Sequence, residues 1–158
     1  MQIKTKLYAT SAIMVVAMLI MAVFGSVQLM RVDSVSTNIV DNNLPRINLM
    51  NRIDVDISDY RGVALEHVIA QDAVTMQNCE SEMASTKNKI EDNLNKYHGM
   101  STMQDKVQQL KEQWKEYSTI VAQMVSASRK NDTAKAMELA AESEKPFNEL
   151  EQTILELE

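Results

Sequence analysis

The segment 103–124, MQDKVQQLKEQWKEYSTIVAQM, decides the fold because its apolar residues recur in alternating steps of four and three. The residues on this stripe are Met103, Val107, Leu110, Trp114, Tyr117, Val121 and Met124. A seven-residue repeat of this kind is typical of a helix that packs along its length against other helices. Ser101 and Gln104 predict a capping box at its start, and Arg129 and Lys130 suit its C-terminal end.

The segments before and after it, residues 76–97 and 137–157, show the same spacing of apolar residues. Before it, the stripe is Met76, Cys79, Met83, Thr86, Ile90, Asn93 or Leu94, and Tyr97. Asp72 is the predicted cap of that helix, and His98-Gly99 its predicted stop. After it, a turn and cap at Asn131-Asp132 lead to the stripe Met137, Ala140, Glu144, Phe147, Leu150, Ile154 and Leu157. Pro146 lies within this last helix and should bend it near Glu142.

One more helix precedes these three, with the stripe Met50, Ile53, Ile57, Tyr60, Ala64 and His67 or Val68. Its apolar face is broad, because Ile47, Leu49 and Val63 widen the stripe. A helix that packed only within its own bundle would need a narrower stripe. The broad face predicts contact with a second subunit as well. Pro45, near the start, predicts a bend or break in the helix.

Glycine and proline usage argues against a β-sheet. Beyond Arg31 the only glycines are Gly62 and Gly99, and the only prolines are Pro45 and Pro146. A sheet would need turn signals every 8–12 residues or so. The sequence therefore predicts an all-α chain, in which four helices form an up-down-up-down antiparallel bundle.

The N-terminal region predicts one membrane crossing. Residues 7–30 carry no charge, and at about 1.5 Å per residue they span roughly 36 Å, enough for a hydrocarbon layer of about 30 Å. Lys4 and Lys6 favour a cytoplasmic N-terminus, so residues 1–6 are assigned to the cytoplasm and 31–158 to the outside. The alternative is a cleaved secretory signal, although the apolar run is long for one and Ala22-Val23-Phe24 is a poor cleavage site. Both interpretations place the bundle in the same compartment.

Charge and cysteine content narrow the function further. After Arg31 there are 13 basic and 22 acidic residues, a net charge of −9. An acidic surface argues against nucleic acid as a partner, because that binding needs clustered positive charge. Cys79 is the only cysteine, so no intrachain disulfide can form. It could join two subunits, but we interpret it as an ordinary small apolar helix residue.

This layout resembles the four-helix-bundle sensor domain of methyl-accepting chemotaxis proteins over essentially the whole chain. The resemblance rests on the basic start, the single crossing, the motifs Asn43-Leu44-Pro45-Arg46-Ile47 and Asp59-Tyr60-Arg61, the heptad helices and the late proline before Phe147. It implies a homodimeric periplasmic receptor in the bacterial inner membrane. Ligand would bind in the membrane-distal part of the bundle, and output parts outside this sequence would control a cytoplasmic kinase and its adaptor.

Two alternatives remain at this stage. The same sensor module occurs in membrane histidine kinases and cyclic-dinucleotide enzymes, and a membrane-anchored helical bundle could have no signalling role. Since the stripe of Leu150, Ile154 and Leu157 still runs at the chain end, we expect a fragment that stops before a second crossing.

Three arginines are the candidate ligand-binding residues. Arg61, on the broad face, could hold a carboxylate in a bidentate contact, or it could pair with Asp54, Asp56 or an acid of the partner subunit. Arg52 points away from the stripe, and Arg46 could instead order the bend at Pro45. Amino-acid receptors of the family carry further arginines five and nine residues on, where this chain has Glu66 and Ala70. The resemblance thus disfavours an aspartate or serine type of site and leaves small organic anions, aromatic acids, metals or proteins as ligands.

The remaining chemistry-bearing residues are interpreted as structural. His67 and His98 lack companions at metal-ligand spacing, so no metal is expected. The methionines fill a core without a cofactor, and Trp114 and Tyr117 are core residues first. No nucleophile and base pair, phosphate loop or metal quartet occurs, so no catalytic residue is assigned and the chain is predicted not to be an enzyme.

Overall fold

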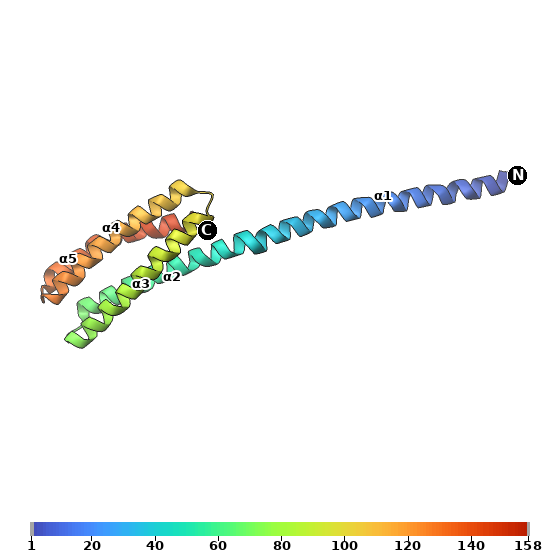
Figure 1. Ribbon diagram of the computed structural model, residues 1–158. Helices are drawn as coiled ribbons and strands as arrows, with labels where there is room; N and C mark the ends of the chain where they lie inside the picture. The colour runs from blue at the N-terminus through green and yellow to red at the C-terminus, as the bar shows by residue number, and fades with distance from the viewer. Residues whose placement is uncertain (1, 158) are drawn as a thin grey trace. The chain divides into compact units, whose positions relative to one another are not determined.

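The computed structural model describes the backbone of residues 2–157, and the side chains of residue 8, residues 13–32, 40–41 and 43–157. The elements are α1 (Gln2–Asn38), the π-helical η1 (Ile39–Asn43), α2 (Leu44–Ile69), α3 (Ala73–Met100), α4 (Gln104–Arg129) and α5 (Thr133–Leu155) (Figure 1). No strand occurs within residues 2–157. The predicted all-α class is confirmed. The chain divides into two compact units, residues 1–45 and 46–158.

The first unit contains the apolar helix. Within α1, Ile13–Val32 is long and apolar enough to cross a membrane. None of the side chains of this stretch is buried against other described residues. Its one hydroxyl, Ser26, donates a hydrogen bond to the carbonyl of Ala22 at 2.8 Å, so this polar group is satisfied inside the helix. The stretch overlaps the predicted crossing at residues 7–30, of which the side chains of residues 7 and 9–12 lie outside the described ones.

The chain around Pro45 is irregular but helical. The π-helical turn of η1 ends at Asn43, and Pro45 is the second residue of α2. Proline has no N–H to continue the hydrogen bonds of the preceding helical turn, and the π-helical turn lies where that bond is missing. The predicted irregularity is therefore a π turn just before Pro45 rather than a break.

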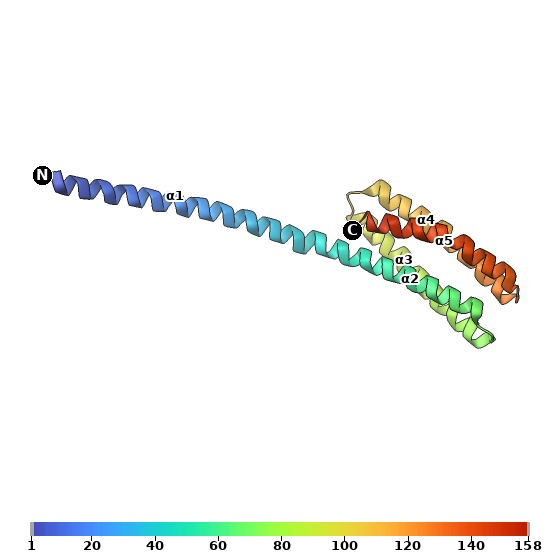
Figure 2. The same cartoon turned by 180° about the vertical axis from the view of Figure 1, so that it is seen from behind.

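The second unit is a bundle of α2, α3, α4 and α5 around one core (Figure 2). The predicted stripe of α2 is buried completely, with Met50, Ile53, Ile57 and Ala64 at 0% exposure. The stripes of α3 and α4 are buried as predicted except at their first residues, since Met76 is half-buried and Met103 is exposed. At roughly 1.5–3 kcal/mol for each large apolar side chain, this burial is the main stabilising term of the bundle.

Side-chain contacts show which helices of the bundle lie next to one another. Lys111 of α4 donates to Asn95 of α3 at 2.8 Å, and Arg129, at the other end of α4, pairs with Glu80 near the start of α3. Lys106, at the start of α4, pairs with Glu156 just beyond α5. In each of these pairs the end of one helix meets the start of the other, as in antiparallel neighbours.

The stripe predicted for α5 is wrong at Met137 and Glu144, whereas Ala140 is half-buried against the core as predicted. Met137 is 57% exposed and the Glu144 side chain 65% exposed, whereas Ala136, Leu139 and Ser143 are buried. The second half, from Phe147 to Leu157, is buried as predicted. The prediction placed Met137 inward, but the buried positions of this half are Ala136, Leu139 and Ser143, one residue before each predicted position. Pro146 lies in the interior of α5, as predicted.

The helix ends follow the expected capping chemistry in two of three cases. The carboxylate of Asp72 accepts from the backbone N–H of Thr75 at 2.8 Å, and that of Asp132 from the N–H of Lys135 at 3.1 Å. Asn131 adopts a positive φ of 58° in the turn before α5, a conformation that asparagine tolerates. The predicted caps at Asp72 and Asp132 are confirmed.

The predicted capping box at Ser101 and the predicted stop at Gly99 are wrong. The hydroxyl of Ser101 accepts from the N–H of Met103, and the Gln104 amide donates to the Ser101 carbonyl at 2.7 Å instead of accepting an N–H. These bonds brace the loop before α4 rather than cap the helix. Gly99 lies inside α3, which ends at Met100, and its φ is not positive.

Candidate functional site

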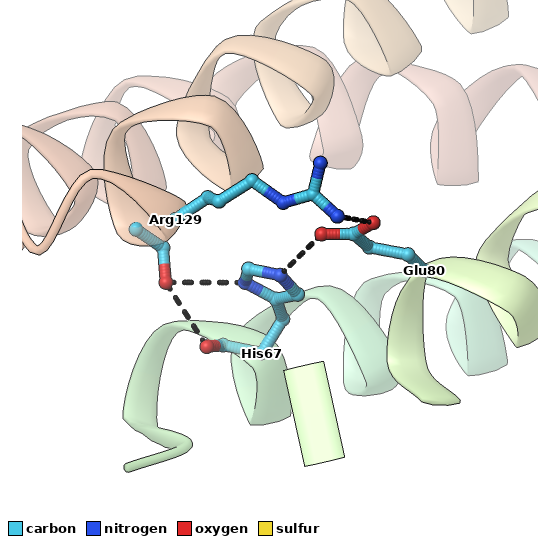
Figure 3. Close-up of polar contacts among 4 residues, drawn as sticks. His67, Glu80 and Arg129 are labelled. Atoms are coloured by element: carbon cyan, nitrogen blue, oxygen red, sulfur yellow. Dashed lines mark hydrogen bonds and ion pairs between the residues drawn. The ribbon is translucent and has the colours of Figure 1, made fainter. Parts of the chain in front are cut away.

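A polar cluster joins three helices of the bundle: His67 of α2, Glu80 of α3, and Ser128 and Arg129 of α4 (Figure 3). His67 has 0% exposure. Its Nδ1 lies 3.1 Å from the Ser128 hydroxyl oxygen, and its Nε2 lies 3.1 Å from Glu80 Oε1. The second carboxylate oxygen of Glu80 accepts from Arg129 at 2.5 Å. The cluster ties the last turns of α2 and α4 to the beginning of α3.

The polar atoms of the cluster form one connected set of hydrogen bonds. A carboxylate only accepts, so Nε2 of His67 donates to Glu80. The Ser128 hydroxyl oxygen lies 3.0 Å from the carbonyl oxygen of His67, to which it can donate, and 3.1 Å from Nδ1 of the same residue. Glu80 thus accepts from His67 with one oxygen and from Arg129 with the other.

The cluster is suited to holding helices together rather than to catalysis. His67 is 0% exposed and Ser128 4%, so the imidazole and the hydroxyl beside it are both closed to a substrate. Among the described residues, no group of three potential metal ligands comes together. His67 is buried in the bundle, as predicted for a packed residue. Its partners Glu80, Ser128 and Arg129 were not predicted, because they lie 13 or more positions away in the sequence.

Arg61, the first candidate ligand-binding residue, packs against α5. Its guanidinium carbon lies 4.1 Å from the centre of the Phe147 ring, a cation–π geometry, and Nη2 lies 3.6 Å from Glu144 Oε1. Its side chain is 29% exposed. Arg61 therefore has one face on an aromatic ring and one edge toward solvent, and its acidic partner is neither Asp54 nor Asp56.

Arg52 lies on a different side of α2. It lines a groove of about 620 Å³ between α2 and α3 with Lys89, Asp56 and the three asparagines Asn48, Asn51 and Asn93. Two cations and three amides make this groove suitable for a small polar anion, and Arg52 is one of the three arginines that the sequence named as candidates. Arg46 is half-buried near the start of α2, and its Nε has no hydrogen-bond partner among the described residues. The structure does not bring the three arginines into one site, because each lies on its own stretch of α2.

The centre of the bundle is aromatic. Tyr60 packs edge-on against Trp114 at 5.1 Å between ring centres, and Tyr117 lies 5.6 Å from Phe147. These side chains are 0–5% exposed, which confirms Trp114 and Tyr117 as core residues. Burial, with a smaller contribution from Glu91, raises the pKa of Tyr60 to about 12. Burial also raises the pKa of Tyr117, and nearby Arg61 opposes that shift. Both tyrosines are therefore neutral near neutral pH.

Comparison with known proteins agrees with this architecture. A family model described as a four helix bundle sensory module for signal transduction matches residues 1–158. The chain belongs to this family, whose role is sensory rather than enzymatic. The resemblance drawn from the sequence is thereby confirmed. Searches of curated proteins and of solved structures found no significant match.

Proposed function

We propose that this chain is the ligand-binding region of a transmembrane methyl-accepting chemotaxis receptor. The observation that carries the proposal is the family match over the whole chain, which includes the apolar stretch Ile13–Val32 and the bundle after it. A sensory module attached to a membrane helix is suited to binding a ligand on one side of the membrane and passing the signal to the other side. A histidine kinase or cyclic-dinucleotide enzyme as the output, or a bundle without signalling, are the alternatives.

The proposed location is the inner membrane of a bacterium, with the bundle in the periplasm. Lys4 and Lys6 precede the apolar stretch, and positive residues favour the cytoplasmic side. A reporter enzyme that is active only outside the cytoplasm, fused after residue 158, should be active in cells. Activity only of a cytoplasmic reporter at that position would reverse the orientation.

The proposed ligand of the arginine sites is a small organic anion. Arg61 keeps an edge toward solvent beside Glu144, and Arg52 shares its groove with Lys89. Arg46, whose Nε has no hydrogen-bond partner among the residues that the structure describes, is the third proposed contact. A guanidinium can accept a carboxylate with two parallel hydrogen bonds.

A homodimer is supported by a second stripe on α2. The exposed residues Leu44, Asn48, Asn51, Val55, Ser58, Gly62, Leu65 and Ile69 recur in steps of four and three, on the side away from the core. Leu65 is 40% exposed and Ile69 73% exposed. A Cβ at Gly62 would meet nothing within 4 Å, so another helix could approach there closely. A heptad stripe left exposed on one helix fits the same stripe of a second copy.

The test is a hybrid receptor. Residues 1–158 would be joined to the second crossing and cytoplasmic part of a well-characterised chemoreceptor, and kinase activity would be followed while small organic acids are added. We expect at least one acid to change kinase activity, and Arg61→Ala to shift the response. If no acid in a broad panel changes the output of a hybrid that is inserted and folded, the sensory proposal is wrong.

A further inference from the structure

We propose that the groove between α3 and α4 binds a small organic dianion, such as a dicarboxylate, at a site separate from the three arginines. The groove has a volume of about 520 Å³ and lies between residues 87–95 and 111–119. Its α3 side is formed by Lys87, Glu91, Leu94 and Asn95. Its α4 side is formed by Lys111, Trp114, Lys115, Ser118 and Thr119. This volume lies within the usual range of small-molecule sites, about 300–1,000 Å³.

The charge of the groove is opposite to that of the bundle. Three lysines face one glutamate, a net excess of two positive charges in a region of the chain that carries −9 after Arg31. Lys111 and Lys115 are four residues apart on one face of α4, where like charges destabilise a helix. Glu91 lies 3.9 Å from Lys87, and Lys111 donates to Asn95 at 2.8 Å. Lys115 has no ion pair or side-chain hydrogen bond to any described residue.

A buried donor in the same groove has no partner. Trp114 is 3% exposed, and its indole N–H makes no hydrogen bond to any described residue. A buried donor left unpaired is unfavourable and rare in native proteins. The hydroxyls of Ser118 and Thr119 donate to the carbonyl of Lys115 and so do not serve Trp114. This unpaired donor thus belongs to a side chain that lines the groove, beside Lys111 and Lys115.

The distribution of the lysines favours two carboxylates over one. Lys111 and Lys115 lie on α4 and Lys87 lies across the groove on α3, while Leu94 and Trp114 provide apolar surface between them. A ligand with a carboxylate at each end and methylenes in the middle matches both charges and the apolar floor. A bound dianion would thus link α3 to α4.

The only tryptophan of the chain reports on this site. The full chain in detergent micelles would be titrated with succinate while Trp114 fluorescence is recorded, with isothermal calorimetry as the second measurement. We expect a saturable change with a dissociation constant on the order of 1 mM or below. Butyrate, succinamide and sodium chloride at matched ionic strength are expected to have little effect. Equal responses to these three would overturn the proposal.

Lysine variants test whether succinate binds at the groove or is attracted by positive charge anywhere on the bundle. Lys115→Gln should weaken succinate binding roughly tenfold, the loss expected for one charge-assisted hydrogen bond. Lys145→Gln is the matched control, because this 86% exposed lysine pairs with Glu149 on α5, outside the groove. Unchanged binding in Lys115→Gln and Lys111→Gln, or binding of inorganic phosphate in place of succinate, would refute the dicarboxylate site.

This inference deepens the proposed sensory function and rests on it for its biological meaning, but its test does not. The titration measures binding on the chain itself, whereas the hybrid receptor measures output. Succinate binding without any output from the hybrid would contradict the sensory proposal alone. A hybrid that responds to acids while the groove binds none would contradict the groove alone.

Discussion

At the residue scale, the buried polar cluster shows why a histidine lies in an apolar stripe. Both ring nitrogens of His67 and both carboxylate oxygens of Glu80 have partners, so the burial cost is offset by hydrogen bonds. Removing His67 leaves one carboxylate oxygen of Glu80 without its partner, which costs more than the loss of a typical surface hydrogen bond.

His67→Ala should lower the free energy of unfolding by about 2–3 kcal/mol, because a buried side chain and two hydrogen bonds are lost. Urea unfolding followed by circular dichroism measures this difference. His98→Ala is the control, since the side chain of His98 makes no hydrogen bond to the described residues, and it should change stability by less than about 0.5 kcal/mol. Equal effects of the two substitutions would contradict the structural role of the cluster.

Asp72 gives the α3 terminus a pH dependence. Hydrogen bonds from the backbone and side chain of Thr75 lower the pKa of Asp72 below its usual value. A lowered pKa in the folded state means that the contribution is complete above the unfolded pKa, about 4, and is lost as the pH falls through the folded value.

Asp72→Asn tests this dependence, because asparagine caps a helix well but does not titrate. The melting temperature of the wild type should fall more steeply than that of Asp72→Asn as the pH is lowered below about 4. Parallel curves for the two proteins would show that the cap does not contribute in this way.

At the element scale, the sequence predicted the stripes of α2, α3 and α4 because their buried positions carry large apolar residues. It failed in the first half of α5, where the buried Ala136 and Ser143 are small and the larger Met137 lies outside. Residue size alone cannot tell which of two adjacent stripes faces a close neighbour. The caps at Asp72 and Asp132 were predictable, because capping depends on residues three positions apart.

Partners across helices were not predictable from the sequence. The pairing of Arg61 with Glu144 and Phe147, and of His67 with Glu80, depends on how helices are staggered, which no local pattern specifies. Sequence reasoning placed Arg61 beside the α2 stripe, where it is half-buried, but did not predict its surroundings, and its role as a ligand contact stays a prediction. The lysines of the α3–α4 groove carried one usable signal, the spacing of four between Lys111 and Lys115.

The two faces of α5 can be distinguished by substitution. Ala136→Leu places a larger side chain at a position with 0% exposure and should destabilise the bundle by about 1–3 kcal/mol through overpacking. Met137→Ala, at the exposed neighbouring position, should change stability by less than about 0.5 kcal/mol. Thermal or urea unfolding of both variants decides the question, and the reverse order of effects would restore the stripe predicted from the sequence.

At the scale of the whole molecule, the exposed heptad stripe of α2 predicts how two copies associate. Leu65→Lys places a charge in the C-terminal half of this stripe, where two parallel copies would bring the same charges together. It should weaken dimerisation at least about tenfold, with little effect on helix content. Sedimentation of the full chain in detergent, at several concentrations, measures the association.

The control for this prediction is Ser85→Lys, which adds the same charge at an exposed position of α3. It should leave the association unchanged. A chain that remains monomeric under all conditions, or one whose dimer is indifferent to Leu65→Lys, would show that the stripe is not the contact.

The burial of Cys79 has a practical consequence for trapping such a pair. Only 4% of this residue is exposed, and burial together with Glu66 and Glu82 raises the pKa of its thiol. A thiol held protonated and covered reacts slowly with alkylating reagents and oxidants. Cys79 should therefore not interfere with site-directed crosslinking. In Ser58→Cys, the new thiol on the exposed stripe of α2 would be the one that joins two copies.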